Sequence, residues 1–177
     1  MTRMISHIPV FSRLPAMVLA TLLMFSGCSG YQLGSTLPPD LNSIFVPTFV
    51  NSTKEPSLEV RTTRAVIEEL QRDGSLKVTD ALKADATLLV EITKYELEPV
   101  KYQKTRIKTP QQYIMTIEVN IVVKARLTGK IIAEATVDGY ASFEPKGDMT
   151  TAKREALPAT ARDLAHDIVE VLVEYWE

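Results

Sequence analysis

Alternation of apolar and polar residues predicts a long β-hairpin in the middle of the chain. Between positions 113 and 127 every second side chain is apolar, which is the period of a strand with one buried face. These positions are Tyr113, Met115, Ile117, Val119, Ile121, Val123, Ala125 and Leu127. A tight turn is predicted at Thr128 and Gly129, and residues 131–143 then alternate again. The two segments are therefore predicted to pair antiparallel.

A third long strand is predicted over residues 87–97. The apolar positions are 88, 90 and 92, and the parity then changes to Tyr95 and Leu97. A change of parity within a strand is typical of one extra residue, so we expect a β-bulge near Thr93 and Lys94.

Two shorter apolar segments predict minor strands. Residues 44–50 resemble a first strand interrupted at Pro47, and residues 76–79 are a candidate for a further one. Proline cannot donate to a strand ladder, so Pro47 indicates an edge position or the end of the strand.

Apolar residues at helical spacing predict two amphipathic helices. The first covers residues 57–73, with Ser57 as its cap and Gly74 as its left-handed stop. Its predicted inward face is Val60, Thr63, Ile67 and Leu70, with Val66 beside it. The second covers residues 151–175, and Pro158 inside it predicts a kink or a later start. Its apolar stripe is Leu157, Ala161, Leu164, Ile168, Val171, Leu172 and Tyr175.

This order of elements predicts an α+β fold for residues 43–177. We expect a two-layer sandwich, with two helices packed on one face of a mixed, mostly antiparallel four-stranded sheet. The other sheet face carries four apolar side chains among polar ones: Leu89, Ile114, Val122 and Tyr140. A mixed face of this kind is either solvated or meets a partner, and the pattern leaves both alternatives open.

The first 27 residues read as a targeting segment. Arg3 and Arg13 precede an apolar run of about twelve residues, shorter than the roughly 20 needed to span a bilayer. Small residues then precede Cys28, which resembles a bacterial lipobox. We therefore expect a cleaved lipoprotein signal peptide over residues 1–27, lipid on Cys28, and a lipidated tether over residues 28–42. A plain signal peptide or an uncleaved anchor helix is the alternative.

Composition narrows the function classes. The 177 residues are 45% hydrophobic and 24% charged, with a single cysteine, which excludes a disordered chain and a disulfide scaffold. Removing residues 1–27, which carry two basic residues and no acid, leaves 150 residues and moves the net charge from -2 to -4. An acidic domain of this kind does not bind nucleic acid by bulk charge.

Candidate catalytic chemistry is sparse. His166 is the one histidine after the targeting segment, and it lies among Asp163, Asp167 and Glu170 on what reads as a solvated helix surface. The chain has no paired-cysteine motif, no spaced-histidine motif and no glycine-rich phosphate loop. We expect no enzyme activity, no cofactor and no metal.

One local cluster is basic, although the domain as a whole is acidic. Lys101, Lys104, Arg106 and Lys108 fall within eight residues that contain no acid, between two long strands at one end of the sheet. Such a basic island suits phosphates or carboxylates, because Lys supplies a point charge and Arg a fork of donors. The alternative is a solvated hairpin whose lysines protect its edges from pairing.

The joint order of these features resembles the LptE family of lipopolysaccharide-assembly lipoproteins. After Cys28 come Gly-Tyr-Gln-Leu-Gly at residues 30–34, Leu-Pro-Pro at residues 37–39, and Ala-Asp-Ala at residues 84–86. Ser29 separates Cys28 from the glycine, a small departure from the family pattern. In enteric bacteria an Asp directly after the lipidated cysteine retains a lipoprotein in the inner membrane. Here Ser29 occupies that position, which favours the outer membrane.

The resemblance implies an outer-membrane lipoprotein on the periplasmic side. Such proteins plug the LptD β-barrel, help it assemble and contact lipopolysaccharide. A basic residue between the central strands is implicated in that contact, which here implies Lys101, Lys104, Arg106 or Lys108, with Lys104 and Arg106 foremost. The alternative is an outer-membrane lipoprotein of similar build that faces the periplasm and activates a cell-wall synthesis enzyme.

Overall fold

The structure is a computed structural model that describes residues 41–103 and 106–174. The predicted signal peptide and Cys28 lie outside the described residues. In order, the elements are β1 (Ser43–Phe45), β2 (Val50–Asn51), α2 (Leu58–Asp73), β3 (Lys77–Val78), β4 (Ala86–Gln103), β5 (Arg106–Ala125), β6 (Ile131–Phe143) and α3 (Met149–Glu174). Within these ranges no helix combines the length and apolarity needed to cross a membrane.

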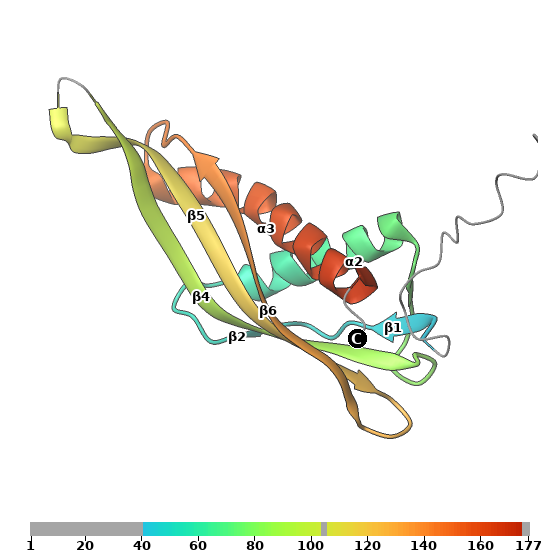
Figure 1. Ribbon diagram of the computed structural model, residues 1–177. Helices are drawn as coiled ribbons and strands as arrows, with labels where there is room; N and C mark the ends of the chain where they lie inside the picture. Colours follow the sequence, from blue (N-terminus) through green and yellow to red (C-terminus); the bar gives the residue numbers. More distant parts are fainter. Residues whose placement is uncertain (1–40, 104–105, 175–177) are drawn as a thin grey trace, which may run out of the picture. The chain divides into compact units, whose positions relative to one another are not determined.

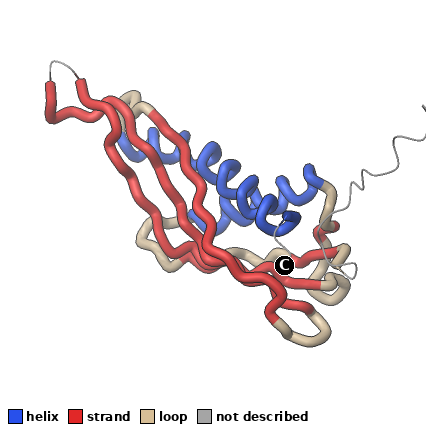
Figure 2. The backbone as a smooth tube through the Cα atoms, in the orientation of Figure 1, coloured by secondary structure: helices blue, strands red, loops and turns tan. Residues whose placement is uncertain are grey.

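The strands form one sheet, and both helices lie on the same face of it (Figures 1 and 2). The strand order is β3-β1-β4-β5-β6, and β2 pairs separately with β4. The two-layer α+β fold is therefore as predicted. The predicted four-stranded, mostly antiparallel sheet is wrong, because the sheet has six strands and is mixed.

Three short strands account for this difference. β1 pairs parallel with β3 and β4, and β2 pairs parallel with β4, whereas only β4-β5 and β5-β6 are antiparallel. β2 and β3 have two residues each, too few for an alternation to be visible. The break at Pro47 leaves β1 and β2 as separate strands.

The predicted bulge in β4 is confirmed. Ile92 pairs with Val119 and Lys94 pairs with Glu118, so Thr93 has no partner of its own in β5. The Thr93 hydroxyl instead donates to the carbonyl oxygen of Glu118 at 3.2 Å. Beyond the bulge Tyr95 and Leu97 pack against the core, as the change of parity predicts.

The core lies between the sheet and the helices. Five alternating side chains of β5 are completely buried: Met115, Ile117, Val119, Ile121 and Val123. Two positions predicted to face inward do not. Leu127 is 84% exposed in the β5-β6 turn, and Ile131 is 48% exposed next to a register shift in the ladder. Gly129, with φ 65°, supplies the left-handed residue of the predicted turn.

Helix α2 buries Thr63, Val66 and Leu70 as predicted, but its inward face also includes Thr62 and leaves out Val60. Val60 is 60% exposed, whereas Thr62 is fully buried beside Leu58, Val66 and Leu70. Thr62 and Thr63 tolerate burial because their hydroxyls donate to carbonyl oxygens one turn back, at 2.8 and 2.6 Å.

Of the two predicted ends of α2, only the C-terminal one is confirmed. Ser57 has φ 64° and makes no side-chain cap, so the predicted hydrogen-bonded cap is wrong. The C-terminal stop is confirmed, because Gly74 has φ 79° and its N–H donates to the carbonyl of Leu70 at 3.0 Å.

Helix α3 begins well before Pro158. Its first turn is capped by Asp148, whose carboxylate accepts the N–H of Thr151 at 2.9 Å. Hydrogen bonds from the Thr151 and Thr150 amides lower the pKa of Asp148, the Thr151 contribution being the larger. The helix is continuous from Met149, so the later start predicted from the proline is wrong. Five positions of the predicted stripe are buried: Leu157, Ala161, Leu164, Ile168 and Leu172.

Helix α3 approaches β6 closely at Gly139. A Cβ atom at this position would lie 2.3 Å from the backbone nitrogen and 2.4 Å from the Cα of Leu164. Only a glycine leaves room for this approach. The neighbouring Tyr140 N–H donates to a carboxylate oxygen of Asp163 at 2.8 Å, which fixes the helix to the strand at the same point.

Candidate functional site

A two-stranded arm projects from one end of the sheet. The last β5-β6 pair joins Tyr113 to Phe143, but β4 and β5 continue to pair beyond it as far as Gln103 and Arg106. Residues 100–103 and 106–112 therefore form the two strands of a hairpin arm that neither β6 nor α3 accompanies (Figure 1). Its ladder is irregular, with three register shifts after Pro99.

The predicted basic island lies in this hairpin arm. The backbone of Lys101 is in β4, opposite Gln112, and Arg106 begins β5 opposite Gln103. Lys108 also lies within β5. Lys104 is outside the described residues, as are the side chains of the other three. The island was expected between two strands, whereas the structure continues both strands through most of it.

An aromatic pair marks the base of the hairpin arm. The rings of Tyr113 and Phe143 stack with centroids 5.8 Å apart and planes inclined by 23°. The two residues are directly opposite each other in β5 and β6. Such a pair stabilises the last cross-strand contact before the arm continues alone.

A half-buried ion pair lies at the same end of the helical layer. Nζ of Lys153 in α3 is 2.6 Å from a carboxylate oxygen of Glu55 and lies over the ring of Tyr95, 5.3 Å from its centroid. Burial, and secondarily the charge of Glu55, raises the pKa of Tyr95 well above its ordinary value. The cluster joins α3, the loop before α2, and β4, so it secures the part of the molecule from which the arm extends.

The outer face of the sheet, away from the helices, is acidic. Between Ile114 and Lys124, the even-numbered positions of β5 and the positions opposite them in β4 and β6 carry six carboxyl groups and two lysines. The acids are Glu91, Glu96, Glu98, Glu118, Glu134 and Asp138, and the bases are Lys94 and Lys124. Lys94 pairs with Glu96 at 2.6 Å, and this hydrogen bond with the surrounding carboxylates raises the pKa of Lys94.

Apolar side chains interrupt this acidic face. As the sequence predicts, Leu89 and Tyr140 point outward, and they are 37% and 60% exposed. Ile114 and Val122 are partly buried on the same face. The molecule thus separates an acidic sheet face from a basic hairpin arm.

His166 belongs to an exposed surface cluster that lines an open groove between α2 and α3. Its potential ligand atom lies within 4.8 Å of those of Asp167 and Glu170, and Nδ1 is 3.9 Å from a carboxylate oxygen of Glu69 in α2. His166 and Glu170 are exposed. Burial, together with the charges of Asp163, Glu170 and Asp138, raises the pKa of the Asp167 carboxyl, although His166 opposes this. No nucleophile is hydrogen-bonded to His166 within the described residues.

The sequence did not indicate the Lys153 cluster. Its three members come from separate segments, and none belongs to a local motif. The only available signal is that Tyr95 follows the change of parity in β4 and thus faces the helices.

Comparison with known proteins identifies the family. A family model described as LptE, lipopolysaccharide-assembly, matches residues 41–172. A search of curated proteins finds no matching sequence.

Solved structures show the same fold. CT253 from Chlamydia trachomatis has a TM-score of 0.55 at 11% identity, covering 76% of this chain and 97% of its own. XCC0632 from Xanthomonas campestris has a TM-score of 0.54 at 12% identity, covering 77% of this chain and 88% of its own. The family match spans every described strand, α2 and nearly all of α3, and the chain therefore belongs to the LptE lipopolysaccharide-assembly family.

Proposed function

We propose that this chain is an outer-membrane lipoprotein that plugs the lipopolysaccharide-transport β-barrel, helps it assemble, and contacts lipopolysaccharide with its hairpin arm. The observation that carries this proposal is the family match over residues 41–172. Members of this family are non-enzymatic lipoproteins, so the chain acts by binding. In the proposal, lipid on Cys28 holds the domain on the periplasmic side of the outer membrane.

The hairpin arm is the part best suited to an anionic lipid head group. It concentrates four basic residues in a segment without acids. It is also only two strands wide, so it reaches away from the packed domain. The acidic outer face of the sheet repels anionic lipids, which leaves the arm as the favoured contact for lipopolysaccharide.

The outer sheet face suits the barrel instead. Exposed Leu89 and Tyr140 among carboxylates offer apolar contact area surrounded by polar groups, which is the composition of protein interfaces. A plug of this kind depends on shape and hydrogen-bond complementarity, and it requires no catalytic group.

Purification of the tagged full chain in mild detergent tests the partner. We expect a large outer-membrane β-barrel protein of the LptD type to accompany it in constant ratio. The control is the C28S variant, which removes the lipid and is expected to leave the membrane fraction. Recovery of a cell-wall synthesis enzyme in place of the barrel would refute the proposal.

A separate experiment tests the hairpin arm. The variant K101S/K104S/R106S/K108S is expected to bind lipopolysaccharide at least about tenfold more weakly, because it loses several charge-assisted contacts. The matched control K54S/K77S/K83S/K130S removes the same charge from exposed lysines outside the arm. Equal binding by the two variants would assign the contact to net charge rather than to the arm.

A further inference from the structure

Two turns lie side by side at the end of the sheet opposite the hairpin arm (Figure 1). One turn leads from β3 into β4, and the other joins β5 to β6. Two hydrogen bonds hold them together: the Arg126 backbone N–H donates to the carbonyl of Asp85 at 2.8 Å, and the Arg126 Nε donates to the carbonyl of Ala84 at 2.6 Å. Residues 79–85 and 126–131 are called the tip below.

The tip exposes large apolar side chains. Leu82 is 88% exposed, Leu127 is 84% exposed and Ile131 is 48% exposed. Among the side chains that the structure describes, no other large apolar one is more than 61% exposed. A cleft of about 370 Å³ at the same end is lined partly by apolar side chains, among them Leu41 and Ile132. Single exposed apolar residues are ordinary, but several on adjacent turns mark a contact surface.

Each of these apolar residues has a basic neighbour in the sequence. The neighbours are Lys83, Arg126 and Lys130, and all three are exposed. The tip also carries two acids, Asp80 and Asp85, so three bases and two acids leave a net charge of +1. The carboxylate of Asp85 accepts hydrogen bonds from the start of β1, which turns it away from an approaching ligand. The tip is thus apolar and mildly basic, in contrast to the acidic outer face of the sheet.

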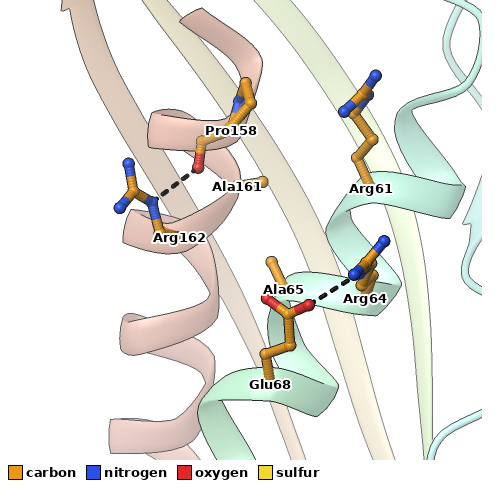
Figure 3. A pocket seen from close by; sticks show the side chains of 7 residues that line it. All are labelled: Arg61, Arg64, Ala65, Glu68, Pro158, Ala161 and Arg162. Carbon is orange, nitrogen blue, oxygen red and sulfur yellow. Dashed lines mark hydrogen bonds and ion pairs between the residues drawn. The ribbon is translucent and has the colours of Figure 1, made fainter.

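The arginines between α2 and α3 do not form a comparable surface. Arg64 turns to Glu68 at 2.8 Å, and Arg162 turns to the carbonyl of Pro158 at 3.1 Å, so the two guanidinium groups point apart (Figure 3). The apolar side chains between them are small. Of these two basic clusters, the tip is the one that combines positive charge with exposed leucines.

The described chain begins at the tip. Leu41 lines the same cleft as Leu127. Cys28 lies 41 − 28 = 13 positions earlier, which corresponds to at most about 45 Å of extended chain. The 20 residues of β5 span about 65 Å, and the hairpin arm is at the far end of that strand. A lipid on Cys28 therefore keeps the tip, more closely than the arm, beside the membrane.

From this arrangement we propose that the tip contacts the surface of an anionic phospholipid bilayer. Its exposed apolar side chains enter the boundary between head groups and acyl chains, and its basic side chains meet the lipid phosphates. The inference rests on the proposed function, because lipid on Cys28 supplies the anchor. The anchor raises the effective concentration of the bilayer at the tip, so a contact that is weak by itself suffices. The contact fixes which end of the domain faces the bilayer surface.

A fluorescent label on the tip tests this contact. Cys28 is the single cysteine of the chain, so T128C offers the one free thiol once lipid occupies that of Cys28. Thr128 is exposed, and its replacement leaves all three apolar side chains in place. The lipidated full chain is placed in vesicles of equimolar phosphatidylcholine and phosphatidylglycerol. We expect a water-soluble quencher to reach the label in T128C at least several-fold less than the label in V60C, on the exposed side of α2.

Variants in the T128C background separate the two contributions. L82S/L127S/I131S should restore quenching to the level of V60C, because the apolar contact is lost. K83S/K130S should reduce the protection several-fold, and vesicles of phosphatidylcholine alone should do the same. K54S/K146S removes the same charge from exposed lysines outside the tip and should leave the protection unchanged.

Each remaining outcome decides against a named part of the proposal. Equal quenching in T128C and V60C would overturn the contact, as would protection that survives in L82S/L127S/I131S. Protection that rises with the number of chains per vesicle would assign the tip to a second copy of the chain instead of the bilayer. Labelling of the unmodified chain would show that Cys28 is free, so failure of the lipid anchor and failure of the tip contact are separable.

Discussion

The backbone N–H of Tyr140 donates to the carboxylate of Asp163 at 2.8 Å. Tyr140 lies in β6, the strand at the end of the described sheet, and Asp163 lies in α3. The helix thereby occupies a donor that an unpaired edge would otherwise offer to another chain, which is one way in which proteins protect sheet edges.

Removing this acceptor should loosen the edge of β6. D163A is expected to lower the free energy of unfolding by about 1 kcal/mol and to speed hydrogen exchange at the Tyr140 amide. D163N keeps an acceptor oxygen and relieves the same charge repulsion with Asp167, so the difference between the two variants isolates the hydrogen bond. Urea unfolding and amide exchange measure both effects. Identical exchange in the two variants would contradict the assignment.

Gly139 should not accept a side chain. G139A places a methyl group against backbone atoms of Leu164, which cannot rotate away as a side chain would. We expect the free energy of unfolding to fall by about 3 kcal/mol, the upper part of the range for overpacking. S142A, on the exposed face of the same strand, is the control and should change stability by less than about 0.5 kcal/mol. If G139A melts at the same temperature as the unmodified chain, α3 must move away from β6 without a loss of stability.

Two buried threonines should respond in opposite directions to valine. The Thr160 hydroxyl is buried in α3 and has no hydrogen-bond partner among the described residues, whereas the Thr62 hydroxyl donates to Leu58. T160V replaces an unsatisfied polar group with a methyl of similar size, so it is expected to raise the free energy of unfolding by about 1 kcal/mol. T62V loses a hydrogen bond and should lower it by a similar amount. Chemical denaturation compares them, and a destabilising T160V would indicate a partner for its hydroxyl.

Asp85 should make the domain sensitive to acid. Its carboxylate accepts from the Ser43 hydroxyl at 2.6 Å and from the amides of Ser43 and Asn42. The Ser43 hydroxyl is the main reason that the pKa of Asp85 lies below its ordinary value of 3.8. The unfolded chain therefore takes up this proton first. The stabilisation is fully present above pH 3.8 and is lost as the pH falls through the lower folded pKa.

The D85N variant tests this linkage. It should be less stable than the unmodified chain at neutral pH, and the difference should shrink as the pH falls below 3.8. Unfolding by urea at a series of pH values measures the difference. A gap that stays constant across the acidic range would show that Asp85 is not the titrating group.

The long elements were predictable because their patterns are long. The alternation in β5 and β6 extends over many residues, and the predicted bounds of β6 match the observed ones. The bulge was predictable because one unpaired residue reverses every later position in β4. The two-residue strands β2 and β3 are too short to carry such a pattern. Their pairing depends on α2, which returns the chain to the same sheet.

Burial was harder to predict where a polar side chain forms a hydrogen bond within its own helix. Thr62 reads as polar but is buried, because its hydroxyl is bonded within its own helix. Val60 reads as apolar but faces solvent. The basic island was visible as a run of charges, although its strand structure was not, because the hairpin arm has no apolar alternation.

The bulge at Thr93 also decides where β4 tolerates a change of length. Deleting another residue between Ala86 and Pro99 would turn the side chains that follow it in this stretch to the opposite face and bury charges against the helices. At Thr93 the strand already carries one residue more than its partner, so deleting that residue would remove the bulge and keep the pairs Ile92–Val119 and Lys94–Glu118. Between Ala86 and Pro99, insertions and deletions during the divergence of such chains are therefore expected to concentrate at this position, while the number of residues on either side of it stays fixed.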